Sequence, residues 1–531
     1  MMLARRRKIR SDHVGTWSFL LVILSAIPTP ASFSDSPLAS LDIETSRRWV
    51  EKRDQVLSWE MGDRLSDEEV GITEYVTKKN KGTGGILKSR WSDFRVQELR
   101  ARDREPVVLS HTRAPRSRRE DGPRFLRFVM AKAGYDTISA VSRLASWLRI
   151  PRQAFSYAGV KDKSAVTSQE VTLDGKGLNM TSAAAKLLSV SSWLPRVKVG
   201  SMEWCDAALR PGESAGNRFT LLLRHLSTKR ESRVVRCVRR VQRRGFINYY
   251  GHQRLGLGMR SSMPTINVGK ALLQCKWEAA VGCVMSTEHA TDEQERRAKA
   301  LFQRGWVQWL RSSRADASAR REALQRLAAT CLPLLPGHCY GEISLISALK
   351  DGASLQQALR AMPHRTMYML GYWSWLWNVC ASERVRRFGA KRCVPGDLVC
   401  ADMGQAASAL QRDWPLTVHV VTAQEAEDKV FSPFDIVLPV LGRSVLVSLP
   451  DNELAQHMAS LIDAQGMRSV VDGPPSLLSS RQPCLFRPLL VKPHNLTHQV
   501  LHYHSDADIE VVQDDAFGHY AARGRGGGSA A

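Results

Sequence analysis

One carboxylate, Asp162, stands between two lysines, Lys161 and Lys163. A cation within a few ångströms favours the ionised form of a carboxylate, and the ionised form is the one that acts as a nucleophile or a base. A β-favouring stretch begins at Val166, so Asp162 is predicted to lie on a loop that enters a strand, where catalytic groups are common. The same three residues are also typical of a solvated charged turn, and the rest of the chain must decide between the two interpretations.

The elements around this loop can be predicted from the spacing of apolar residues. Phe94 and Val96 alternate with polar neighbours as in a half-buried strand, and a similar alternation predicts a strand over residues 219–223. Asp136 can cap a helix that precedes the Asp162 loop. Farther along the chain, residues 262–430 show a mainly helical pattern, and the aromatic residues of 368–377 are spaced like a packed helical core.

The charge of the chain favours a polyanionic partner. The 531 residues carry a formal net charge of +24. Binding of such a surface to phosphates releases counterions, which favours nucleic acid, and an anionic membrane surface is the alternative. The ten cysteines include no CxxC pair, which argues against a zinc ribbon or a redox dithiol and favours reduced thiols in the core.

A predicted helix over residues 229–244 concentrates the positive charge. Val234 and Val238 share one of its faces, and the other face holds arginines. Four of these arginines are candidate RNA contacts: Arg236, Arg239, Arg240 and Arg243. They form either a solvated helix face or a surface that follows an RNA backbone.

Four separated segments resemble, in order and spacing, the motifs of the TruD family of RNA pseudouridine synthases. They are residues 84–98, 155–169, 216–219 and 245–256, and weaker likenesses occur at Asn378, 396–399 and 435–439. The likeness covers residues 70–510. Ile247 and Leu255 stand where the family usually has proline and phenylalanine, which are apolar exchanges in a packing context.

The resemblance implies an α/β fold in which a mixed, mostly antiparallel sheet forms a catalytic domain interrupted by a mainly helical inserted domain. The expected divisions are a leader and variable extension at 1–65, the catalytic domain at 66–247 and 448–510, the inserted domain at 248–447, and a disordered glycine- and arginine-rich tail at 511–531.

The resemblance also implies an activity, which is the isomerisation of uridine to pseudouridine in RNA. Transfer RNA is the expected substrate and messenger RNA is the alternative. The reaction breaks the C1′–N1 bond, rotates the base and joins it again through C5, and it needs no metal or redox cofactor. The carboxylate would either attack the sugar or assist its deprotonation.

Roles for single residues follow from the same resemblance. Asp162 is implied to be the catalytic aspartate, Asn217 to orient it by a hydrogen bond, and Phe219 to stack on the uracil, an interaction worth about 1–3 kcal/mol. Lys88 and Lys161 are the candidate basic partners of the aspartate. Outside the motifs, Asn217 and Phe219 would be interpreted as a strand cap and a core phenylalanine.

Arg254, in the fourth segment, is expected to hold the domain junction or the RNA backbone. The target uridine must leave its stack to reach the aspartate, which costs a few kcal/mol unless the uridine already lies in a loop.

The N-terminus has the layout of a targeting sequence. Arginines and a lysine precede an apolar run over residues 17–27, which is too short to span a bilayer comfortably. This predicts import into a mitochondrion or plastid if the leader is real, and otherwise an intracellular protein of the nucleus or cytoplasm. No stable membrane partner is expected.

Two other function classes stay open at this point. The first is a non-catalytic RNA-binding protein or RNA chaperone on the same fold, against which the presence of Asp162, Asn217 and Phe219 argues. The second is a membrane-associated basic protein, which rests only on the N-terminal run and the net charge.

Overall fold

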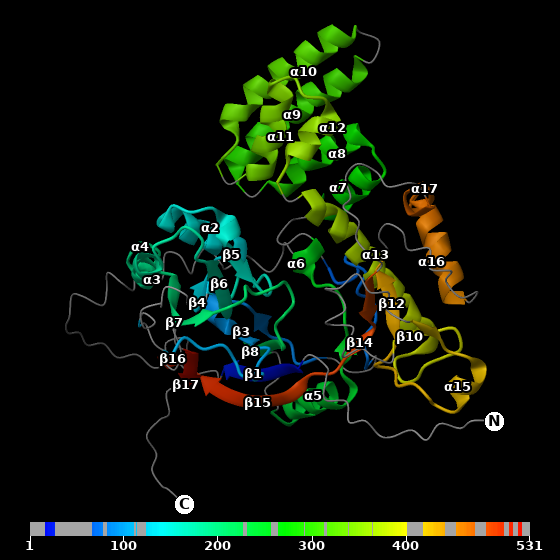
Figure 1. Cartoon of the computed structure of the whole chain (residues 1–531). Helices are drawn as coiled ribbons and strands as arrows, with labels where there is room; N and C mark the ends of the chain where they lie inside the picture. The colour runs from blue at the N-terminus through cyan, green and yellow to red at the C-terminus, as the bar shows by residue number, and fades with distance from the viewer. Residues whose placement is uncertain are drawn as a thin grey trace, which may run out of the picture.

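The computed structural model describes the greater part of the chain. The described residues are 16–26, 66–77, 82–110, 113, 124–226, 231–255, 264–290, 292–312, 316–337, 339–363, 365–400, 418–440, 453–472, 485–503, 509–512 and 519–522. They form a mixed sheet and a separate helical region (Figure 1).

The main sheet has nine strands among the described residues. In spatial order its path is β15 (His494–Tyr503), β1 (Thr16–Ala26), β8 (Gly216–Arg224), β3 (Phe94–Leu99), β6 (Val166–Asp174), β4 (Phe125–Ala133) and β7 (Val197–Cys205). The short strands β2 (Ile86–Leu87) and β5 (Phe155–Tyr157) pair with β8 and β6. Five of the pairings in this sheet are antiparallel: β2–β8, β3–β8, β4–β6, β4–β7 and β5–β6. The other three are parallel: β1–β8, β1–β15 and β3–β6.

Helices cover one face of the half of the sheet that holds β4, β6 and β7. They are α2 (Thr137–Leu148), α3 (Met180–Leu188) and α4 (Val190–Trp193). As predicted, Asp136 caps α2, because its side chain accepts a hydrogen bond from the Ser139 amide at 2.8 Å. The apolar stripe of α2 is buried against Phe128 and Val171 of the sheet, so the predicted helix and strand pattern of this region is confirmed.

A buried ion pair joins the strands that carry the candidate aromatic residues. The Arg224 guanidinium at the end of β8 donates to both carboxylate oxygens of Asp93 at 2.8 and 2.9 Å, and both side chains are buried. Asp93 also accepts from the Arg90 amide at 2.9 Å. This bidentate pair fixes the start of β3 against β8, which sets the register Val96–Phe219 and Glu98–Asn217.

A second core lies in the helical region. It is built by α7 (Pro264–Leu273), α8 (Trp277–Val284), α9 (Glu293–Arg311), α10 (Ala317–Cys331), α11 (Tyr340–Lys350) and α12 (Leu355–Ala361). The long helix α13 (Arg365–Phe388) connects this region to the rest of the molecule (Figure 1). Tyr372, Trp373 and Trp377 of α13 are buried, so the aromatic run belongs to the core, as its spacing predicts.

A third core surrounds the C-terminal part of α13. It includes α16 (Glu453–Ala464), α17 (Arg468–Asp472) and the two-stranded sheets of β12 (Val437–Val440) with β13 (Leu485–Pro488) and of β14 (Leu490–Val491) with β9 (Phe246–Ile247). Nearby are β10 (Leu398–Val399), β11 (His419–Val420) and α15 (Ala423–Glu427). The buried Asn378 amide donates to the carbonyls of Val70 and Tyr250 and accepts from the Tyr250 amide, so this motif residue ties three chain segments together.

Short parts of both ends of the chain form strands among the described residues. The apolar run becomes strand β1 between β8 and β15, because a run of apolar and aromatic residues also favours a buried strand. Residues 509–512 and 519–522 form the antiparallel pair β16 and β17, whose bounds are Ile509–Val512 and His519–Ala522. The glycine run itself lies outside the described residues.

Cysteines behave as reduced residues where the structure describes them. All nine described cysteines are free, and Cys331, Cys339, Cys380, Cys393 and Cys400 are buried. Burial raises the pKa of the Cys380 thiol to about 12, which keeps it protonated and unreactive near neutral pH.

Candidate active site

Asp162 lies where the sequence predicts, on the loop between β5 and β6. Its Oδ2 atom is 3.0 Å from the Lys88 ammonium, and the two side chains are 38% and 24% exposed. The carboxylate is therefore paired with a cation and still accessible to a substrate. The cation comes from a residue 74 positions earlier in the sequence, so the partner of Asp162 is supplied by the fold.

Lys88 is held in an uncommon conformation. Its φ angle is 58°, in the left-handed region that a non-glycine residue rarely adopts. Its ammonium lies 3.9 Å from the centroid of the Phe94 ring, a cation–π contact. The backbone strain at Lys88 is the kind that accumulates at functional sites. Phe94, which the sequence identifies only as a strand residue, thus belongs to the site.

The two lysines beside Asp162 do not pair with it. Lys161 turns inward and donates to Glu98 Oε2 at 2.5 Å, with the side chains 7% and 3% exposed. Lys163 is exposed to solvent. The buried Glu98 carboxylate also accepts from the Glu170 amide at 3.2 Å. Lys161 therefore anchors the loop to β3, and the candidate role of Lys161 as a partner of Asp162 is not what this geometry favours.

A buried lysine, which the sequence analysis missed, holds the backbone of the same loop. Lys132 of β4 is fully buried and donates to the carbonyls of Tyr135, Asp162 and Lys161 at 2.7, 3.0 and 3.3 Å. Loss of hydration on burial lowers the pKa of Lys132 to about 7, a fall that the charges of Asp136 and Asp162 partly oppose. A lysine inside the otherwise apolar run of residues 128–133 was the available signal, because such a residue needs polar partners.

Replacing Lys132 with Met tests this assignment through pH. Between about pH 7 and the ordinary lysine pKa of about 10.4, the unfolded chain binds a proton at Lys132 that the folded chain does not. The free energy of unfolding of the wild type must therefore rise with pH in this window relative to Lys132→Met. Chemical denaturation across the window measures the difference, with Lys163→Met as a control for the loss of one lysine. If the difference in the free energy of unfolding between the wild type and Lys132→Met did not change with pH, the lowered pKa of a buried Lys132 would be contradicted.

Two neutral side chains complete the support of the loop. Thr137 at the start of α2 accepts from the Lys161 amide at 2.8 Å and donates to Gln169 Oε1 at 2.8 Å. Gln169 in turn donates to the Gly159 carbonyl at 2.9 Å. The backbone of Gly159, Lys161 and Asp162 is thus tied to α2, β4 and β6, which limits the positions that the Asp162 carboxylate can occupy.

Asn217 and Phe219 lie on the same face of β8, as their spacing predicts. Phe219 makes an edge-to-face contact with Phe94, with the ring centroids 5.9 Å apart. Since Phe94 also contacts Lys88, the ring of Phe219 belongs to the surroundings of Asp162. The Oδ1 atom of Asn217 is buried and has no hydrogen-bond partner in the described structure. A bond to the Asp162 carboxylate would be donated by the Nδ2 atom of Asn217, so the unpartnered Oδ1 does not bear on it, and the orienting role of Asn217 stays a prediction.

The candidate RNA-contacting arginines occupy two places. Arg236, Arg239, Arg240 and Arg243 are exposed on α5 (Glu231–Arg244). The opposite face of α5 buries Val234 and Val238 against Leu496 and Val500 of β15. This is the amphipathic arrangement that the sequence predicts, and it leaves the arginines free to meet an anion.

Arg254 lies on the short helix α6 (His252–Leu255), near the junction of the sheet with the helical region (Figure 1). Its Nε atom is buried and has no hydrogen-bond partner in the part of the chain that the structure describes. The pKa of the half-buried Arg487 is lowered, mainly by desolvation and to a smaller extent by the positive charge of Arg254. Arg487 stacks on Tyr250 at 3.9 Å. Two guanidinium groups near one another favour an anionic ligand at this junction.

The described residues contain neither a metal-binding cluster nor a membrane-spanning helix. No group of three or more histidine, cysteine, aspartate or glutamate side chains there has the arrangement of a metal site. None of the described helices combines the length and the apolar character that crossing a membrane requires.

Comparison with known proteins gives one consistent family. The family model described as tRNA pseudouridine synthase D (TruD) matches residues 69–499. The mouse protein named Pseudouridylate synthase PUS7L is 28% identical over 391 residues, which is 71% of this chain and 51% of that protein. The fission yeast Multisubstrate pseudouridine synthase 7 is 28% identical over 432 residues, 75% of this chain and 58% of that protein. The chain thus spans about half the length of the curated relatives that it matches.

A solved structure shares the fold. The putative tRNA pseudouridine synthase D (TruD) from Methanosarcina mazei aligns with a TM-score of 0.52 and 19% sequence identity, covering 80% of this chain and 88% of that chain. The similarity supports the mixed α/β architecture with a helical region.

Proposed function

The chain belongs to the tRNA pseudouridine synthase D (TruD) family, and from this premise we propose that it isomerises uridine to pseudouridine in RNA with Asp162 as the catalytic carboxylate. The observation that supports the proposal best is the pairing of Asp162 with Lys88 at 3.0 Å beside the aromatic rings of Phe94 and Phe219. An accessible carboxylate, a cation that favours its ionised form and a surface for stacking a base are the groups that this reaction needs.

The reaction is an internal exchange of bonds at one nucleotide. The bond from C1′ to N1 breaks, the uracil turns, and a bond from C1′ to C5 forms, after which C5 gives up its proton and N1 carries one. Asp162 would act on the sugar, either by attack or by removing a proton, and its support by Lys132, Thr137 and Lys161 would hold it in position. No atom is gained or lost overall.

The proposed substrate is a loop uridine of transfer RNA, with messenger RNA as the alternative. The net charge of +24 and the arginines of α5 support an RNA partner. A uridine that is already unstacked saves the few kcal/mol that flipping would otherwise cost. Arg254, beside Arg487, is proposed to contact the RNA backbone near the site.

Loss of the C5 hydrogen provides a direct test. RNA transcribed with tritium at C5 of uridine should release tritium to water when it is incubated with the chain, because rejoining through C5 displaces that hydrogen. Unmodified transfer RNA transcripts are a suitable first substrate. Bound RNA without any release of tritium would instead favour the non-catalytic RNA-binding alternative.

Phe219→Ala is expected to lower turnover by roughly 5- to 150-fold, because one base–aromatic stack contributes about 1–3 kcal/mol. Affinity for bulk RNA should change much less, since other contacts bind the backbone. Phe219→Leu is the matched control, because it keeps an apolar side chain against Phe94 while removing the ring. An equal fall in turnover and in RNA affinity would indicate that Phe219 serves the core only.

A further inference from the structure

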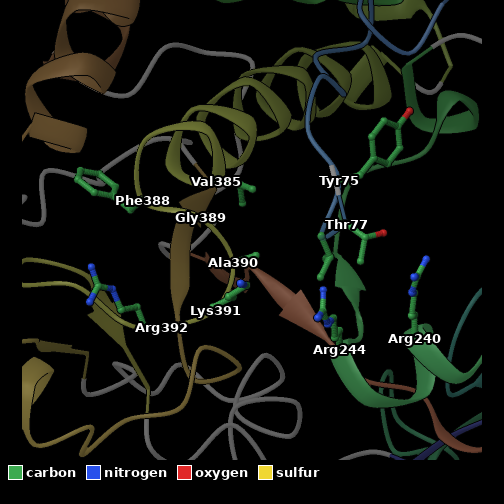
Figure 2. Close-up of a pocket in the computed structure, with 11 residues that line it drawn as sticks. Tyr75, Thr77, Arg240, Arg244, Val385, Phe388, Gly389, Ala390, Lys391 and Arg392 are labelled. Atoms are coloured by element: carbon green, nitrogen blue, oxygen red, sulfur yellow. The ribbon is translucent and has the colours of Figure 1, made fainter. Parts of the chain in front are cut away.

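A basic cavity lies apart from the Asp162 loop, where α5 meets the end of α13 (Figure 2). Its volume is about 720 Å³. Its lining includes Arg240, Arg244, Lys391 and Arg392, together with Tyr75 and Phe388. Figure 2 shows Arg240 and Arg244 rising from α5 toward the segment that carries Tyr75 and Thr77, with Ala390 and Lys391 across from Arg244.

The charge of this cavity has one sign. Four of its lining residues are cationic and none is acidic. Within the described residues, none of the side chains of Arg240, Arg244, Lys391 and Arg392 makes an ion pair with a carboxylate. Exposed arginine helices usually offset their charge with nearby acids, so the free cations here are available for an external anion.

The buried side chain of Arg384 fixes the backbone of the turn that carries Lys391 on one side of the cavity. Arg384 of α13 donates to both carboxylate oxygens of Asp397 at 2.6 and 2.7 Å. The same guanidinium donates to the carbonyls of Gly389 and Arg392 at 2.7 and 3.2 Å. Because its backbone is fixed from within, the 389–392 turn presents its side chains in a defined place.

The chemistry of the lining suits a segment of RNA backbone. Arginine binds phosphate oxygens through paired N–H groups, and lysine adds a compact charge. Val76, Val385 and Phe388 provide apolar surface on the same cavity, against which a ribose or a base can pack. A cavity that offers both kinds of contact fits a nucleotide segment better than a free inorganic anion.

The position of the cavity separates it from the catalytic loop. Helix α5 packs on β15, and β15 is four strand positions from β6, where the Asp162 loop ends. At the usual strand spacing this is roughly 20 Å. A stacked strand rises 3.4 Å per nucleotide, so the span from β6 to β15 corresponds to about six nucleotide steps. One RNA could occupy both only if it extends well beyond the target uridine.

We propose that this cavity is a second RNA-binding site, which holds backbone phosphates of the substrate remote from the target uridine. The proposal rests on the proposed function, because it takes RNA as the substrate. It separates the arginines of α5 into two groups: Arg240 and Arg244 bind RNA in the cavity, whereas Arg239 and Arg243 lie outside it. The second site would make long RNAs better substrates than short ones.

The test compares two charge reversals on the same helix. Arg240→Glu with Arg244→Glu alters the cavity, and Arg239→Glu with Arg243→Glu makes the same change of charge outside it. Binding of unmodified transfer RNA transcripts is measured at several salt concentrations. The cavity variant should lose about one unit of salt slope for each lost phosphate contact and bind about tenfold more weakly, and the control variant should lose clearly less. Lys391→Glu with Arg392→Glu, on the opposite wall, should reproduce the loss.

Kinetics separate this site from the catalytic one. For the RNA that the wild type modifies, the cavity variant should show a raised KM with little change in kcat. A fragment with fewer than about six nucleotides on either side of the target uridine should be modified equally by both proteins. Equal effects of the two reversals on α5, or no effect of either, would overturn the second site while tritium release by the wild type still supported the proposed function. A wild type that binds no RNA would overturn both.

Discussion

Asp162→Asn is expected to abolish formation of pseudouridine, lowering turnover by about 10⁴-fold or more. The substitution keeps the shape of the side chain and removes the negative charge, so neither attack on the sugar nor removal of a proton is possible. The fold should persist, because the side chain is 38% exposed and its single ion pair, with Lys88, is partly solvated. Loss of such a pair costs about 0–1 kcal/mol.

RNA affinity separates this prediction from a loss of structure. The variant should bind transfer RNA transcripts about as tightly as the wild type, since the backbone contacts proposed in the cavity and at Arg254 do not involve Asp162. Asp351→Asn, which removes an exposed carboxylate from the end of α11, is the matched control and should retain full activity. Substantial turnover by Asp162→Asn would show that another group is the catalytic carboxylate.

Lys161→Met is expected to destabilise the sheet around the catalytic loop by about 3–5 kcal/mol, which is the cost of leaving one member of a buried ion pair alone. Glu98 is 3% exposed and Lys161 supplies the cation at 2.5 Å. Amide hydrogen exchange of β3 and β6 measures the local free energy of opening. Activity should fall as well, because the loop that carries Asp162 loses its anchor to β3.

Restoring neutrality provides the control for this prediction. The double variant Lys161→Met with Glu98→Leu removes both charges from the buried site, and much of the lost protection should return, because an apolar pair of similar volume often replaces a buried ion pair without loss. If the β6 amides of Lys161→Met alone exchanged as slowly as those of the wild type, Lys161 would contribute little to holding the loop.

Local patterns in the sequence were sufficient to predict several elements. The cap at Asp136 and the amphipathic face of α5 each depend on neighbours within a few residues, and both are present. The strand β3 also forms, but Arg95 and Glu98 are buried in it, so the predicted alternation of buried and exposed side chains is not observed. The position of Asp162 before β6 follows from the same kind of pattern. Spacing of this kind reports which residues share a face, as Asn217 and Phe219 do on β8.

The partners of charged groups could not be predicted in this way. The lysines next to Asp162 suggested that one of them would support its charge, but Lys161 pairs with Glu98 and the cation comes from Lys88. Neighbours on an extended loop point in opposite directions, and contacts between distant segments depend on sheet order. The role of Lys132 required β4, α2 and the catalytic loop to meet, and the cavity required α5 to meet the end of α13.

The apolar run near the N-terminus shows a limit of a different kind. Its composition fits a targeting sequence, and it equally fits the strand β1 that the structure forms between β8 and β15. Periodicity cannot distinguish these outcomes, because a short continuous apolar run carries no period of either kind. The choice depends on whether the sheet offers a place for another strand.

Mapping of pseudouridine tests the central claim most directly. Small RNA that lacks modifications is incubated with the purified chain and, in parallel, with its Asp162→Asn variant, and pseudouridine is then located nucleotide by nucleotide. We expect new pseudouridine at defined loop uridines with the wild type and none with the variant, which would establish the reaction, the carboxylate and the target together. RNA that is bound by both proteins but modified by neither would contradict the assignment of this chain as a pseudouridine synthase.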